Sequence, residues 1–228
     1  MPSDVTILEH LFEEQPIVES RKLSFGFAFF KRTVDIVTSL ILLPIIVVIC
    51  ALALILNPIL NRGKLFYTQN RVGKNNTVFR IYKLRTMQGG AESTKFATEE
   101  KSRITPLGRF MRNIHVDELP QIVNVLIGDM SLIGPRPEQP EFFQNYVQNI
   151  EGFSRRQSVR PGVSGLAQLC YGYTDSPVGA RRKLKWDLEY IHHQGFFLET
   201  QIYLRTFVYI FFRIGKCLLD MIKPTKKG

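Results

Sequence analysis

Residues Ile36–Leu60 read IVTSLILLPIIVVICALALILNPIL, without one charged side chain. A helix of this length exceeds the roughly 30 Å hydrocarbon thickness of a bilayer, because each residue adds about 1.5 Å. The stretch therefore predicts a membrane helix near the start of the chain. A chain of 228 residues is long enough to bury one good core beside that helix, so we expect one globular domain with a membrane anchor.

Basic residues flank this helix on both sides. Lys31 and Arg32 precede it, and Arg62 and Lys64 follow it. The positive-inside rule places both flanks on the cytoplasmic side, which one helix satisfies only by entering and leaving through the same face. Pro44 gives a physical reason for the necessary bend, because proline lacks an N–H and its ring clashes with a carbonyl one turn earlier. Charge and hydropathy leave a single span and a re-entrant helix both open.

The charge balance indicates an anionic partner. Thirty Lys and Arg residues against 20 Asp and Glu residues give a net charge of +10 and a pI near 9.6. This excess suits nucleic acid, anionic lipid or a phosphate-rich substrate, and the absence of a nucleic-acid-binding motif disfavours the first. Three cysteines are an odd number and Cys50 lies inside the apolar run, so we expect no disulfide framework and a reducing compartment.

The pattern along the chain predicts a mixed fold, mainly α with a short β-hairpin. We expect an amphipathic lead-in over 1–30, the membrane helix over 31–62, a cytosolic domain over 63–195, and a membrane-surface helix with a basic tail over 196–228. Leu65–Gln69 and Val78–Leu84 resemble strands around a polar turn at residues 70–76. Apolar spacing predicts helices over 122–126, 180–193 and 197–222. Charged residues interrupt the last of these, which favours an interfacial amphipathic helix.

One acid pair, Asp117-Glu118, stands out at a predicted loop-to-helix junction. Acids at a helix start are usually caps or complements to the helix dipole, and Pro120 fits the first turn of such a helix. A second interpretation is a metal site, because Mg²⁺ is commonly held by one or two carboxylates together with substrate phosphates.

Basic residues near the acid pair provide a candidate phosphate site. Arg112 precedes the pair, and Arg136 lies between two prolines. Lys83 lies on the second predicted strand, and Arg85 follows directly after its end. Guanidinium groups match phosphate oxygens, so carboxylates, a cation and arginines together indicate phosphoryl-group chemistry. For Arg136 the alternative is a surface arginine in a rigid turn. Strand alternation does not tell which face Lys83 and Arg85 present.

Several ordered motifs together resemble a known family. They are Lys31–Asp35, Gln69–Gly73, Phe79–Met87, Asp117–Gln121, Gly128–Pro137, Arg160–Gln168 and Trp186–Tyr190. In this order they resemble the bacterial sugar transferases, the monotopic polyprenyl-phosphate phosphoglycosyl transferases, in their small form. The resemblance covers residues 30–215. Residues 113–116 and 170–173 depart from the residues that are common in the family.

The resemblance implies a reaction, a location and a membrane topology. Sugar-1-phosphate would move from a UDP-sugar to polyprenyl phosphate, with undecaprenyl phosphate as the expected form, and UMP would be released in the first membrane step of surface glycan assembly. Asp117 would be the nucleophile that forms an aspartyl-phosphosugar intermediate. Glu118 would help to bind Mg²⁺, and Asp117 is predicted as a second ligand of the same ion. The expected place is the cytoplasmic face of the bacterial inner membrane, with a re-entrant anchor.

The remaining expectations concern substrate binding and partners. The predicted substrate-binding residues are Lys83, Arg85, Arg112, Arg136, Arg160 and Asp187. For Asp187 a salt bridge with Lys183 on the face of a helix is the alternative. The expected partners are a UDP-sugar, polyprenyl phosphate and membrane lipid, without nucleic acid, and a homodimer is left open. A competing hypothesis is a non-catalytic membrane scaffold or regulator with a basic lipid-binding surface, which gives no reason for the acid pair.

Overall fold

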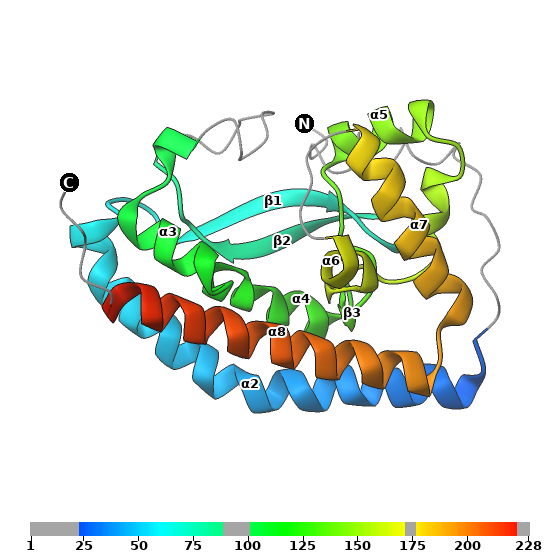
Figure 1. The fold of residues 1–228 in the computed structure, drawn as a ribbon, viewed down its shortest axis with the longest axis horizontal. Coiled ribbons are helices and arrows are strands. Elements are labelled where there is room, and N and C mark those ends of the chain that lie inside the picture. Colours follow the sequence, from blue (N-terminus) through cyan, green and yellow to red (C-terminus); the bar gives the residue numbers. More distant parts are fainter. Residues whose placement is uncertain (1–22, 89–100, 172–176, 223–228) are drawn as a thin grey trace.

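Two long helices form one layer beneath a mixed domain (Figure 1). The computed structural model describes residues 23–88, 101–171 and 177–222. Its elements are α2 (Phe25–Leu60), β1 (Phe66–Val72), η1 (Lys74–Asn76), β2 (Val78–Leu84), η2 (Lys101–Arg103), α3 (Pro106–Asn113), η3 (Val116–Gln121), α4 (Ile122–Ile127), β3 (Ser131–Ile133), α5 (Pro140–Asn149), η4 (Phe153–Ser158), β4 (Gly162–Ser164), α6 (Leu166–Tyr171), α7 (Pro177–His193) and α8 (Phe196–Ile222), where η marks a 3-10 turn. The mainly helical fold with a short hairpin is confirmed. Most of the predicted lead-in lies outside the described residues.

Helix α2 packs against the domain along one face from end to end. Its buried residues recur at helical spacing, as one face of a helix requires. They are Phe27, Asp35, Ser39, Ile46, Ala53 and Asn57. The helix continues through Pro44 and Pro58, and its cyan end turns towards the start of β1 (Figure 1). Helix α2 therefore rests along the domain instead of projecting away from it.

The opposite face of α2 is apolar and exposed. Ile41, Val48 and Ile55 are among its uncovered side chains. Among the described residues, α2 is the one helix that is long and apolar enough to cross a membrane. A contiguous apolar surface of this kind needs a covering environment, and a bilayer supplies one.

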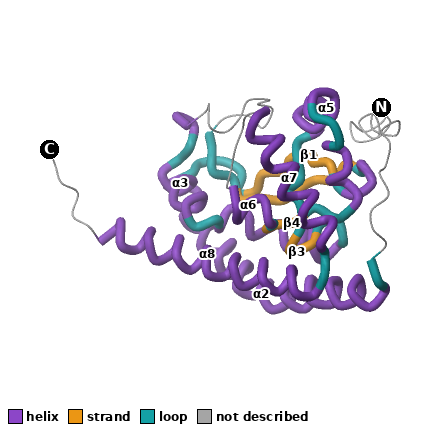
Figure 2. The backbone as a smooth tube through the Cα atoms, turned by 45° about the vertical axis from the view of Figure 1, so that its right-hand side comes forward, coloured by secondary structure: helices purple, strands orange, loops and turns teal. Residues whose placement is uncertain are grey.

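Helix α8 lies beside α2 and runs in the same direction, as both views show (Figures 1 and 2). Their starting turns are joined by aromatic rings: Phe196 packs against Phe27 and Phe30, with ring centroids 5.3 and 4.7 Å apart. Farther along, α8 exposes Phe207 and Phe211. The two helices therefore present apolar side chains from a single layer of the molecule.

Strands β1 and β2 form an antiparallel hairpin whose register runs from Phe66 opposite Leu84 to Val72 opposite Val78. The predicted turn at 70–76 was too long, because residues 70–72 continue β1 and the turn begins at Gly73. Burial explains the difference, since Val72 is fully buried and anchors the end of the strand. A parallel pair of short strands, β3 and β4, was not predicted.

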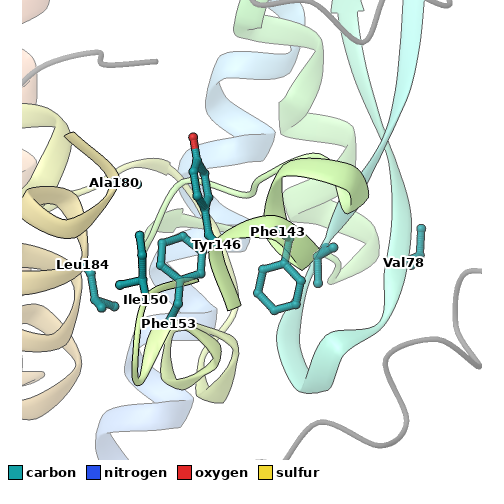
Figure 3. Close-up of a cluster of buried hydrophobic side chains, with 8 residues drawn as sticks. Val78, Phe143, Tyr146, Ile150, Phe153, Ala180 and Leu184 are labelled. Carbon is teal, nitrogen blue, oxygen red and sulfur yellow. The ribbon is translucent and has the colours of Figure 1, made fainter. Parts of the chain in front are cut away.

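Two cores hold the parts that surround the acid pair. One core joins the turn end of the hairpin to α5, η4 and α7, and includes Phe143, Tyr146 and Phe153 (Figure 3). The other lies between α2, β2, α4 and β3. Within it, Asn124 on α4 is completely buried; its Oδ1 accepts the N–H of Tyr82 at 3.2 Å and its Nδ2 donates to the carbonyl of Arg80 at 2.7 Å. These bonds fasten β2 to α4.

Candidate active site

The acid pair lies in η3, the 3-10 turn that leads into α4. His115 immediately before it has a φ of 58°, in the left-handed region that histidine tolerates better than most residues. The chain thus changes direction just before the acids, and the N–H of Glu118 donates to the carbonyl of His115 at 3.2 Å. The predicted loop-to-helix junction is confirmed. Pro120 lies inside η3 and not in the first turn of α4.

Glu118 is held by two cations from different elements. Lys83 on β2 places its Nζ 2.9 Å from Oε1 of Glu118. Arg136, in the loop after β3, donates from Nη1 to Oε2 at 3.0 Å and from Nη2 to Oε1. Burial acts to raise the pKa of Glu118, but the charges and hydrogen bonds of Arg136 and Lys83 outweigh it and hold the pKa well below its usual range. Glu118 is therefore a stable anion at neutral pH.

Asp117 is in the opposite electrostatic situation. Its side chain is buried, and burial followed by the charge of Glu118 raises its pKa, although Lys83, Arg112 and Arg136 act in the other direction. The carboxylate of Asp117 is poorly stabilised as an anion, while its neighbour is strongly stabilised. Two adjacent acids with different environments are suited to two different chemical roles.

The charge of Arg112 acts to lower the pKa of Asp117. It is the last basic residue of α3, and its Nε donates to Oγ1 of Thr86 at 2.8 Å. Helix α3 can approach this closely because Gly108 has no side chain: a Cβ there would lie 2.0 Å from the carbonyl oxygen of Thr86. The structure therefore brings Lys83, Arg112 and Arg136 together around the acid pair.

Arg85 and Arg160 have different surroundings. Arg85 Nε donates to the carbonyl of Lys64 at 2.5 Å and its Nη1 to the carbonyl of Met87 at 3.1 Å. Arg160 Nε donates to the carbonyl of Gly128 at 2.9 Å. Both guanidinium groups thus fasten nearby backbone, and their role in substrate binding stays a prediction.

Asp187 lies in a second, buried ion cluster behind Arg136. Its Oδ2 accepts a hydrogen bond from Arg156 Nε at 2.6 Å, and Arg156 Nη2 donates to the carbonyl of Arg136 at 2.8 Å. Glu138 joins the cluster through Lys183, at 3.2 Å, and Arg156, at 3.7 Å. Asp187 therefore reaches the acid pair through Arg156 and the backbone of Arg136.

Arg156 and Glu138 were missed by the sequence analysis. Arg155 and Arg156 are adjacent and chemically identical in the sequence, yet only Arg156 is buried, at 2% exposure. The helical turn η4 decides which of the two faces the core, and no pattern in the sequence marks that face.

The donor set of the acid pair fits Mg²⁺. Mg²⁺ is usually bound through one or two carboxylates and completes its shell with substrate phosphates and water. Asp117 and Glu118 supply two carboxylates, and the described residues contain no cluster of three or more His, Cys, Asp or Glu side chains that would form a closed protein site. Glu118 already accepts three hydrogen bonds; a carboxylate has about four acceptor sites, so capacity for a cation remains.

A helical domain resting on a long apolar helix, with an acid pair among half-buried cations, indicates a membrane-associated protein. The sequence matches the bacterial sugar transferase family over residues 27–213. The chain belongs to this family.

Three relatives illustrate the similarity. A UDP-N-acetylgalactosamine-undecaprenyl-phosphate N-acetylgalactosaminephosphotransferase of Aeromonas hydrophila is 39% identical over 201 residues, which are 87% of this chain and 47% of the relative. A UDP-glucose:undecaprenyl-phosphate glucose-1-phosphate transferase of Escherichia coli is 37% identical over 182 residues, 77% of this chain and 39% of the relative. A putative undecaprenyl-phosphate N-acetylgalactosaminyl 1-phosphate transferase of Bacillus subtilis is 44% identical over 128 residues, 55% of this chain and 72% of the relative. The chain thus spans less than half the length of the first two.

Proposed function

We propose that this protein transfers sugar-1-phosphate from a UDP-sugar to undecaprenyl phosphate or a similar polyprenyl phosphate, and releases UMP. The observation that carries the proposal is the asymmetry of the acid pair: Glu118 is neutralised by Lys83 and Arg136, whereas Asp117 is left as a poorly stabilised carboxylate. The names of the relatives support the donor and acceptor, because they describe UDP-sugars and undecaprenyl phosphate.

The reaction proceeds in two displacements at the β-phosphorus of the donor. A carboxylate oxygen of Asp117 attacks this phosphorus and forms an O–P bond, while the bond to the bridging oxygen breaks and UMP leaves with the electron pair. An oxygen of the dianionic lipid phosphate then attacks the same phosphorus. The aspartyl O–P bond breaks, the carboxylate returns, and polyprenyl-diphosphate sugar is the product. One difficult step becomes two easier ones.

The surrounding residues prepare the nucleophile and receive the phosphates. Glu118 keeps Lys83 and Arg136 in place beside Asp117, so positive charge faces the incoming diphosphate. Arg112 adds a third cation from α3. Mg²⁺, held by Asp117 and Glu118, would supply neutralisation of the diphosphate charge and favour the departure of UMP. Burial of Asp117 removes water that would otherwise solvate the carboxylate and weaken it as a nucleophile.

We also propose that α2 is re-entrant and that α8 lies in the membrane interface on the cytoplasmic side of the inner membrane. Both ends of α2 are hydrogen-bonded to the same polar domain: Lys31 Nζ donates to the carbonyl of Ile133 at 2.9 Å, and Asn61 Nδ2 donates to the carbonyl of Arg85 at 2.7 Å. A helix that crossed the bilayer fully would separate its two ends by the membrane. Single cysteines placed before and after α2 in a cysteine-free variant should both resist an impermeant reagent added to intact cells; labelling of one alone would refute this topology.

The activity is tested by incubating the purified protein with a panel of UDP-sugars and polyprenyl phosphate, with UMP as the readout. We expect release of UMP with one or a few sugars, dependent on both the lipid acceptor and Mg²⁺, and loss of release in Asp117→Asn. Release of UMP by Asp117→Asn at the rate of the unaltered protein would refute the assignment of the nucleophile. Absence of UMP with every donor, in a folded protein, would refute the activity.

A further inference from the structure

The first turns of α2 place three charged side chains against the domain: Lys31, Arg32 and Asp35. Arg32 donates from Nη1 to the carbonyl of Val125 at 2.7 Å and from Nη2 to that of Leu126 at 2.9 Å, which satisfies the end of α4. Asp35 is 2% exposed, although it lies on the helix that carries the apolar surface. These charges therefore have partners in the domain, beyond any effect on membrane orientation.

Two of these side chains hold every residue of β3. Asp35 Oδ1 accepts the hydroxyl of Ser131 at 3.0 Å and the N–H of Leu132 at 2.9 Å. Lys31 Nζ donates to the carbonyl of Ile133 at 2.9 Å. Strand β3 is short and pairs only with the equally short β4 among the described residues. Its position is thus set as much by the side chains of α2 as by its partner strand.

Lys31 is itself fixed by a buried acid. Its Nζ lies 2.9 Å from both carboxylate oxygens of Glu199 on α8. Tyr190 on α7 donates to Glu199 Oε1 at 2.6 Å and contacts the carbonyl of Ile133 at 3.1 Å. Glu199 and Tyr190 are each 1% exposed. The ammonium group of Lys31 therefore lies in a buried hydrogen-bond network that connects α2, α7, α8 and β3.

The chain from β3 to Arg136 has little freedom. It consists of Gly134 and Pro135, and proline fixes its own φ. The N–H of Gly134 donates to the carbonyl of Ser164 at 2.9 Å, and the N–H of Gly162 donates to the carbonyl of Pro135 at 2.9 Å. A shift of β3 is therefore passed on to Arg136, the residue that clamps Glu118.

We propose that Lys31 and Asp35 are positioning residues for the reaction, because they fix β3 and thereby hold Arg136 on Glu118. The inference rests on the proposed function and adds to it a direct connection from the membrane helix to the catalytic turn. Placement of reacting groups is sensitive to small shifts, and a displacement of about 1 Å can cost about a hundredfold in rate. The anchor thus sets the geometry of the site in addition to attaching it to the membrane.

The alternative is that Lys31 acts only as a basic flank that orients α2 in the membrane. Arg62 is the matched control, because it is a basic residue at the other end of the same apolar helix and its side chain is exposed. If orientation is all that matters, Arg62→Met and Lys31→Met should have similar effects. Positioning predicts that only the change at Lys31 alters the site.

The test compares four variants in lipid nanodiscs: Lys31→Met, Lys31→Arg, Lys31→Met/Glu199→Gln and Arg62→Met. The double variant removes both charges of the buried pair and leaves an amide oxygen for Tyr190, so it stays folded if Lys31→Met alone does not. UMP release gives kcat and KM. Hydrogen exchange of residues 131–136 reports on β3 and the following loop without any use of the activity.

We expect kcat to fall about tenfold or more in the double variant, with a smaller change in the KM of the donor. Exchange of residues 131–136 should become faster, Lys31→Arg should recover part of both effects, and Arg62→Met should resemble the unaltered protein. A folded double variant with unchanged kcat and unchanged exchange would overturn the proposal. If the unaltered protein releases no UMP, while exchange of residues 131–136 is still faster in the double variant than in the unaltered protein, the proposed function is refuted and the connection to β3 stands.

Discussion

Replacing Arg136 by methionine removes the two hydrogen bonds that Arg136 makes with Glu118 and leaves Lys83 as the partner of this acid. Methionine keeps much of the volume of the side chain, so the change acts mainly on charge. The side chains of Arg136 and Glu118 are 19% and 12% exposed, which makes the pair more buried than a surface salt bridge. We therefore expect a measurable loss of folding stability together with the loss of activity.

The size of this loss follows from the burial of the pair. Breaking a fully buried pair costs about 3–5 kcal/mol, while an exposed pair contributes about 0–1 kcal/mol. Because Lys83 remains and some solvent reaches both side chains, we expect about 2–3 kcal/mol. For a chain of this size that corresponds to a fall in Tm of about 4–12 °C. Thermal unfolding in detergent, followed by circular dichroism, measures this difference.

The stability loss in Arg136→Met should depend on pH in a direction that follows from the pKa of Glu118. The pKa of Glu118 is held well below its usual range in the folded protein, so the stability from this anion is complete above the unfolded pKa of about 4.3 and is lost as the pH falls through the folded value. The difference between the unaltered protein and Arg136→Met should be largest near neutral pH and should shrink below about pH 4. A loss of less than about 0.5 kcal/mol at pH 7, or a loss that is the same at pH 7 and pH 3, would refute this account of the cluster.

Three further outcomes are expected. Asp117→Asn should abolish activity yet raise Tm at pH 7. The pKa of Asp117 is raised in the folded protein, so its contribution to stability is present below the unfolded pKa and is lost at higher pH. The gain in Tm should therefore vanish below about pH 4, and a lower Tm at pH 7 would contradict the prediction. Gly134→Ala should cost about 2 kcal/mol or more, because a Cβ would lie 2.4 Å from the carbonyl oxygen of Arg160. Gly215→Ala is its control in an open position of α8 and should be neutral or stabilising by about 0.5–1 kcal/mol. Chelation with EDTA should stop the release of UMP and added Mg²⁺ should restore it, whereas full turnover in EDTA would exclude the predicted metal.

The elements with long, regular patterns were predictable from the sequence. The apolar run, the strand Val78–Leu84 and the two C-terminal helices lie where periodicity placed them. The strands β3 and β4 were missed, because three residues are too few to show alternation. Their pairing also joins segments far apart in the chain, which a local pattern does not reveal.

The candidate site was predictable to the extent that its residues belong to recognisable motifs. Lys83 and Arg136 contact Glu118, and the charge of Arg112 acts on Asp117. Their role in substrate binding stays a prediction. Charged residues with ordinary alternative roles were harder to interpret. Which of two neighbouring arginines is buried depends on the orientation of a short turn, and only the packed structure determines it.

The flanks of the membrane helix show the same difficulty. Lys31 and Arg32 were interpreted as topological charges, and the structure gives both of them partners inside the domain. The sequence does not distinguish a basic residue that faces lipid headgroups from one that donates to a carbonyl of the folded chain. The acid that pairs with Lys31, Glu199, lies far away in the sequence.

The central claim is that Asp117 carries the sugar phosphate between donor and acceptor. The most direct measurement is the mass of the protein after incubation with a UDP-sugar and Mg²⁺ without polyprenyl phosphate, followed by identification of the modified peptide. The account predicts one added sugar-phosphate group on Asp117, released as lipid-linked product when polyprenyl phosphate is added, and no adduct in Asp117→Asn. A fully active protein that forms no adduct when polyprenyl phosphate is omitted, or an adduct on a different residue, would contradict it.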